Sequence, residues 1–200
     1  MTIKKHFFIY LFILLVTVIS GCGDNDPKKE DVPEMITKVT LTFTGGGGQV
    51  TVTATDPDGD GVQNIKTDGA ITLTKNTNYI LTLQLINGLA DPGDGAYDVT
   101  KEVQSESDEH QFFYSWTGSA FVSPAGDGNI DNRTDPVNYQ DKDINNFPVG
   151  LTTNWETNTI ATKGAKFRVL LKHQPGLKST TSSSADGETD LDITFDLEIQ

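Results

Sequence analysis

From residue 36 to the C-terminus, apolar and polar side chains alternate with a period of two, which restricts what this chain can fold into. The clearest example is 191–199, where five apolar residues alternate with polar ones: Leu191, Ile193, Phe195, Leu197 and Ile199. A period of two places successive side chains on opposite faces of a β-strand. No segment keeps the 3.6-residue period of a helix, so the pattern predicts an all-β domain.

Seven further segments carry the same strand pattern. Residues 39–44 and 50–55 alternate apolar residues with threonine on either side of four glycines, which predicts a hairpin. The other predicted strands lie at 71–73, 81–85, 112–116, 151–156 and 167–171. Residues 112–116 are apolar on both phases, which favours a central strand. Residues 98–110 fit either a strand or a short helix, and strand with loop is the favoured interpretation.

About eight short strands, separated by turns rich in Gly, Asp, Asn and Pro, predict an antiparallel β-sandwich, Ig-like or related. A closed barrel is the alternative architecture. Residues 35–200 are long enough to form one domain with its own core.

The N-terminal segment has the pattern of a secretory signal. Lys4 and Lys5 precede an apolar run at 7–19, which is too short for a spanning helix of roughly 18 or more residues. The following Ser20-Gly21-Cys22 resembles the lipobox of a bacterial lipoprotein, although a plain signal peptide with an incidental cysteine is the alternative. The resemblance implies a signal peptide at 1–21, acylation of Cys22, and a flexible tether at 22–34.

Charge and cysteine content limit the partners. The net charge of −13 becomes −15 when cleavage removes Lys4 and Lys5 (−13 minus +2). Because such a surface repels phosphates, we expect no nucleic-acid partner. Cys22 is the only cysteine, so disulfides within the chain are excluded. An acylated Cys22 has no thiolate, which excludes cysteine catalysis. The expected location is the cell envelope, with the acylated cysteine in the lipid bilayer, most simply the outer membrane.

The segment from Asp56 to Gly61 has the alternate-Asp spacing of a calcium loop. The hypothesis assigns five oxygen ligands to Ca²⁺: Asp56, Asp58, Asp60, Gln63 and Asn64. The twelfth position is Thr67 rather than the glutamate of an EF-hand, so the site would be a loop between strands. A solvated acidic turn fits the same residues, because Asp and Gly dominate turns. Weaker versions of the spacing occur at 127–131 and 141–145.

Two histidines of the predicted domain are candidate ligands. His110 and His173 could bind zinc or copper together with Asp108 or Glu109, if the fold brings them together. The alternative is that each is a hydrogen-bonded residue at the end of a strand.

Signals for catalysis are weak. The chain has no Gly-x-Ser-x-Gly elbow and no phosphate-binding loop. A glycosidase needs two facing carboxylates, and no spacing selects a pair among the six candidates: Glu102, Glu106, Asp108, Glu109, Glu156 and Glu188. We therefore assign no catalytic residue. Trp116, Tyr139 and Trp155 could form a carbohydrate-stacking platform or belong to the core.

Several short motifs resemble a group of small lipoproteins from Flavobacteria and related Bacteroidetes. Besides the lipobox and the Thr-rich hairpin, they are 108–113 (DEHQFF), 148–151 (PVGL), 171–173 (LKH) and 187–195 (GETDLDITF). The resemblance supplies no catalytic residue. The predicted function is a lipid-anchored, non-catalytic binding module with a protein or glycan partner. The alternatives are a glycan-binding accessory lipoprotein of an outer-membrane uptake system and a secreted hydrolase.

Overall fold

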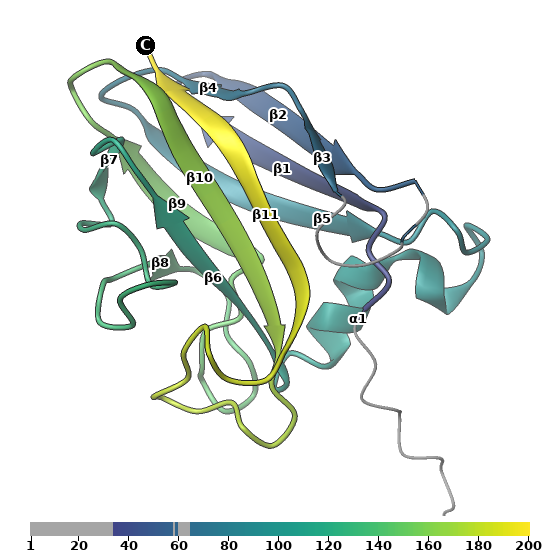
Figure 1. The fold of residues 1–200 in the computed structure, drawn as a ribbon. Coiled ribbons are helices and arrows are strands. Elements are labelled where there is room, and N and C mark those ends of the chain that lie inside the picture. The colour runs from purple at the N-terminus through teal and green to yellow at the C-terminus, as the bar shows by residue number, and fades with distance from the viewer. Residues whose placement is uncertain (1–33, 58, 60–64) are drawn as a thin grey trace, which may run out of the picture. The chain divides into compact units, whose positions relative to one another are not determined.

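The computed structural model describes residues 34–57, 59 and 65–200 (Figure 1). These residues form an all-β domain of two sheets, which confirms the predicted β-sandwich. No helix among them is long and apolar enough to cross a membrane.

The first sheet has seven antiparallel strands in the order β3-β2-β1-β5-β9-β7, with β8 also paired to β9. Their bounds are β1 Lys38–Gly45, β2 Gly48–Thr55, β3 Lys66–Asp68, β5 Asn78–Ile86, β7 Phe121–Ser123, β8 Asn138–Tyr139 and β9 Thr152–Thr157. The predicted hairpin is β1-β2, and its turn uses Gly46 and Gly47 at positive φ, which glycine adopts without steric cost.

The second sheet has four strands in the order β4-β11-β10-β6. Their bounds are β4 Ile71–Leu73, β6 His110–Trp116, β10 Thr162–His173 and β11 Glu188–Ile199. Strand β4 runs parallel to β11, and the other neighbours are antiparallel. All eight predicted strands are present, and the described residues add three short ones: β3, β7 and β8.

The interpretation of 98–110 as strand and loop is wrong, because an α-helix, α1 (Val99–Ser105), occupies this segment after a 3₁₀ turn at Gly95–Tyr97. Val99 and Val103, four residues apart, are both buried on one helical face. The Thr100 hydroxyl accepts a hydrogen bond from Leu85 N–H (2.8 Å) and donates one to the Leu85 carbonyl (3.1 Å). These contacts fix the helix against β5.

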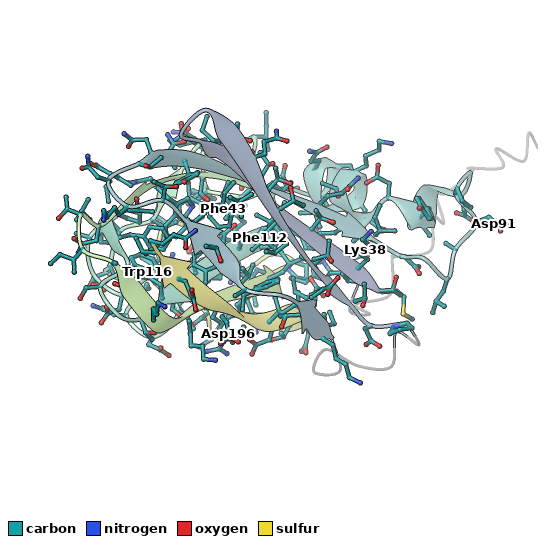
Figure 2. All side chains as sticks on the ribbon, turned by 90° about the horizontal axis from the view of Figure 1, so that it is seen from above. Lys38, Phe43, Asp91, Phe112, Trp116 and Asp196 are labelled. Carbon is teal, nitrogen blue, oxygen red and sulfur yellow. The ribbon has the colours of Figure 1, made fainter. Side chains whose placement is uncertain are left out.

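The apolar side chains of both sheets meet in one large core. Phe43 from β1 and Phe112 and Trp116 from β6 lie between the sheets, whereas Asp196 of β11 is exposed (Figure 2). Phe167 of β10 touches four aromatic rings from both sheets. The two layers are therefore joined mainly through aromatic packing.

The expectation that 112–116 forms a central strand is wrong, since β6 is an edge strand of the second sheet. Both faces are nevertheless buried, because the segment 124–150 covers this edge. Phe112 N–H donates to the Val149 carbonyl (2.7 Å), and Tyr114 N–H donates to Asn129 Oδ1 (3.0 Å). Phe113 packs outside the main core against Ile130 and Leu170. A covered edge needs the same apolar pattern as a central strand.

Candidate functional site

The predicted calcium loop and lipid anchor lie mainly outside the described residues. This applies to Cys22, and to Asp58, Asp60, Gln63 and Asn64. Asp56 directly follows β2 and is buried, and its N–H donates to the Thr37 carbonyl (2.7 Å). The calcium site thus stays a prediction.

Side chains of the two weaker acidic loops, at 127–131 and 141–145, form hydrogen bonds with the backbone. The Asp141 carboxylate accepts hydrogen bonds from the N–H groups of residues 150, 151 and 152, at 2.8–3.2 Å. Asn129 accepts from Tyr114 N–H and donates to the Tyr139 hydroxyl at 2.9 Å. These side chains hold the covering segment against β6 and β9, which is a structural role.

Of the two alternatives for the tryptophans, a carbohydrate-stacking platform or the core, the core is confirmed. Trp116 and Trp155 are buried in the core with ring centroids 5.1 Å apart. Tyr139 is half-buried, and its hydroxyl donates to the Phe112 carbonyl at 2.6 Å. Burial raises the pKa of Tyr139 well above its usual value. Only Tyr139 remains near a surface where a ligand could bind.

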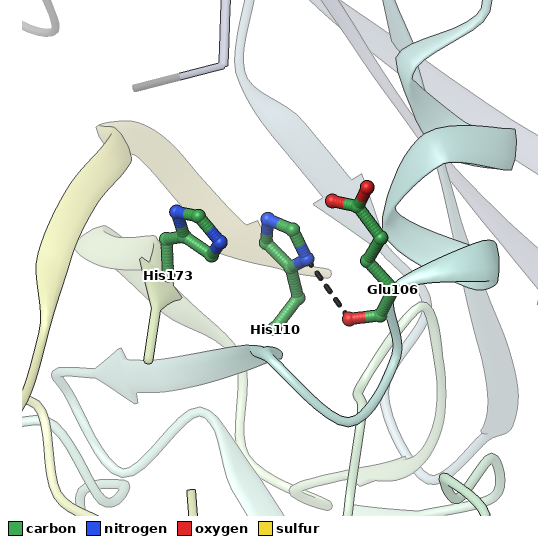
Figure 3. Close-up of side chains that lie close together, drawn as sticks. All are labelled: Glu106, His110 and His173. Carbon is green, nitrogen blue, oxygen red and sulfur yellow. Dashed lines mark hydrogen bonds between the residues drawn. The ribbon is translucent and has the colours of Figure 1, made fainter. Parts of the chain in front are cut away.

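The fold does bring the two histidines together. Strands β6 and β10 pair so that His110 lies directly opposite His173. Both side chains are buried, and their rings are stacked with centroids 4.6 Å apart and planes 8° from parallel (Figure 3). Two imidazoles in contact are a rare concentration of nitrogen donors in a chain with three histidines.

A third candidate ligand comes from the end of α1. Glu106 lies four residues before His110, and one ligand atom from each of Glu106, His110 and His173 lies within 4.8 Å of the others. The sequence hypothesis assigned this position to Asp108 or Glu109 instead. Glu109 also contacts the pair, with Oε2 3.3 Å from His173 Nε2. Helix α1, the less favoured alternative for 98–110, ends directly before Glu106 and so places it near His110.

Two further carboxylates approach His110. Asp190 Oδ2 lies 3.6 Å and Glu34 Oε1 3.9 Å from His110 Nε2, and Glu34 N–H donates to Asp190 Oδ1 (3.1 Å). Strict alternation along β11 would point Asp190 outward. A register shift opposite Leu171 and Lys172 instead leaves Asp190 and Leu191 buried side by side. Such bulges redirect single side chains, and the sequence carried no signal for this one.

Among the six acids considered for a hydrolase, Glu102 and Glu106 lie together, with Glu34 beside them. Glu188 is exposed at the start of β11.

A separate cleft of about 600 Å³ lies over β8 and β9. Four of its nine lining residues carry side-chain amides: Asn138, Gln140, Asn146 and Asn154. The others are Ser123, Val137, Tyr139, Lys142 and Pro148. In a chain with 28 acidic residues, none of these nine is acidic. The cleft therefore offers neutral hydrogen-bonding groups and one cation.

Compared with protein-family models, curated proteins and solved structures, the chain gives no match.

Proposed function

We propose that this chain is a lipid-anchored, non-catalytic binding module of the cell envelope, whose amide-lined cleft binds an uncharged, hydroxyl-rich ligand such as a neutral glycan. Cys22 would attach it to the outer membrane, and residues up to 34 would serve as the tether. Calcium bound by the Asp56 loop would stiffen the neighbouring end of the sandwich. A protein partner is the other candidate ligand.

The cleft composition is the observation that carries the proposal. Amides both donate and accept hydrogen bonds, as sugar hydroxyls do, so the four amide side chains match an uncharged ligand. The cleft floor is held in place, since Asn138 Nδ2 donates to Ser123 Oγ (3.0 Å) and the Asn154 carbonyl (3.3 Å). A pre-arranged polar cleft lowers the entropic cost of binding.

The same composition supports a binding role over hydrolysis. Glycoside hydrolysis ordinarily uses two carboxylates flanking the scissile bond. The nine cleft-lining residues supply none.

A glycan array probed with the full chain tests the proposal, with hits measured by calorimetry. We expect neutral glycans to bind, and the double variant Gln140→Ala/Asn146→Ala to bind about tenfold more weakly, because one to two hydrogen bonds are lost. Gln49→Ala is the matched control, since Gln49 is an exposed glutamine of the β1-β2 hairpin. An array without hits, or equal affinity in the double variant and the control, would contradict the glycan assignment.

A further inference from the structure

We propose that His110, His173 and Glu106 form a transition-metal site that binds Zn²⁺. This site is distinct from the amide-lined cleft and from the predicted calcium loop, so it goes beyond the proposed function. It lies where the ends of β6 and β10 meet the end of α1 (Figure 3).

The hydrogen bonds indicate which nitrogen of each histidine carries the proton. His110 Nδ1 lies 3.1 Å from the backbone carbonyl of Glu106, which can only accept, so Nδ1 carries the proton. His173 Nε2 lies 3.3 Å from the Glu109 carboxylate, which as an ionised group also only accepts. In the neutral rings the lone pairs are then on His110 Nε2 and His173 Nδ1. Metal-binding histidines characteristically donate their other N–H to a carbonyl or carboxylate in this way.

The carboxylates near His110 Nε2 favour positive charge at this point. Asp190 Oδ2 at 3.6 Å and Glu34 Oε1 at 3.9 Å both approach the nitrogen that bears the lone pair. Negative oxygens gathered around a lone pair in a buried site are unfavourable unless a cation lies between them. A metal ion bound to His110 Nε2 would supply positive charge at this point.

The donor set selects among metals. Two imidazole nitrogens and a carboxylate suit zinc and other late transition metals, whereas calcium prefers six to eight oxygen ligands. At Zn–ligand distances of 2.0–2.2 Å, tetrahedral ligand atoms lie about 3.4 Å apart. The three ligand atoms are already within 4.8 Å of one another, so side-chain movements of about 1 Å would close the site. Asp190 or a water molecule would supply the fourth ligand.

The test is a titration of the full chain carrying Cys22→Ser, which removes its only thiol. Zn²⁺ binding is measured by calorimetry, and Co²⁺ binding by the visible absorption of a tetrahedral cobalt complex. We expect one high-affinity site, with Ca²⁺ failing to displace Co²⁺. His173→Asn and Glu106→Gln should abolish the cobalt spectrum. Glu198→Gln, the same change of charge at the far end of β11, should leave it unchanged.

Because a buried histidine variant can fail to fold, Glu109→Gln provides a gentler test. Its side-chain oxygen still accepts from His173 Nε2–H but no longer carries charge. We expect zinc affinity to fall about 10- to 100-fold with the fold retained by circular dichroism.

Two outcomes would overturn the proposal. Absence of Zn²⁺ and Co²⁺ binding at millimolar metal would show that these side chains form a structural cluster and not a metal site. Binding that persists unchanged in His173→Asn, Glu106→Gln and Glu109→Gln would place the metal elsewhere on the chain.

Discussion

Replacing Lys178 with methionine is expected to lower the free energy of unfolding by about 3–5 kcal/mol, the usual cost of removing one partner of a buried ion pair. Lys178 Nζ lies 3.0 Å from Asp143 Oδ2, and the two side chains are 1% and 0% exposed. The same ammonium donates to the carbonyls of Ser107 (2.5 Å) and His110 (2.8 Å). All three of its donors are therefore used.

The ion pair joins three segments that are far apart in sequence. Lys178 comes from the connection between β10 and β11, Asp143 from the segment covering β6, and the two carbonyls from the entry to β6. Burial lowers the pKa of Lys178, and the neighbouring Asp143 opposes that shift. In Lys178→Met the Asp143 carboxylate stays buried without its cation, which is the source of the large cost.

Denaturant unfolding of Lys178→Met and of a control variant checks this expectation. Lys166→Met is the control, because it breaks an ion pair with Asp196 whose side chains are 53% and 63% exposed, and exposed pairs contribute about 0–1 kcal/mol. Adding Asp143→Asn to Lys178→Met should recover part of the loss, since the amide keeps Oδ1 for the N–H groups of residues 145 and 147. A Lys178→Met effect no larger than that of Lys166→Met would show that the buried pair does not stabilise the fold.

Phe167→Ala is also expected to have a large effect, lowering the free energy of unfolding by about 3–5 kcal/mol. The ring is fully buried and lies 5.1 Å from Trp155 and 5.8 Å from Phe43, centroid to centroid. Because it connects side chains of both sheets, truncation leaves a cavity that neither sheet can close alone.

The matched control is Ile144→Ala, which truncates an apolar side chain that is 89% exposed and should change stability by no more than about 0.5 kcal/mol. Thermal and urea unfolding measure both variants. A Phe167→Ala loss below about 1 kcal/mol would contradict the central place of this ring in the core.

The fold was largely predictable because most of its strands keep strict alternation. Strand β11 buries the five apolar residues expected of it, and β1-β2 pairs across the predicted glycine turn. Strand β6 shows where the pattern stops being informative. Apolar residues on both phases report burial of both faces, but they do not say whether a neighbouring strand or the 124–150 segment covers the edge.

The candidate metal site was only partly predictable, for two local reasons. His173 continues the inward phase of β10, so its burial followed from alternation. Glu106 needed the helix, whose seven residues are too few to give a clear periodic signal. Asp190 needed a bulge, which shifts the register by one residue and leaves no trace in composition.

The candidate site and the Lys178 ion pair meet at one residue, His110. Its ring faces His173 and the carboxylates, while its carbonyl accepts from Lys178. Stability of the covering segments and geometry of the candidate metal site are therefore coupled through a single strand end.

The most direct test of the proposed function is acyl labelling and fractionation of the full chain in a bacterium that processes lipoproteins. The account predicts that the chain incorporates labelled fatty acid and sediments with the membrane fraction. Cys22→Ser should lose the label and leave the membrane, and Ser20→Ala, a neighbouring small-residue change, should behave like the wild type. An unlabelled wild-type chain, or membrane association that persists in Cys22→Ser, would contradict the assignment as a lipid-anchored module.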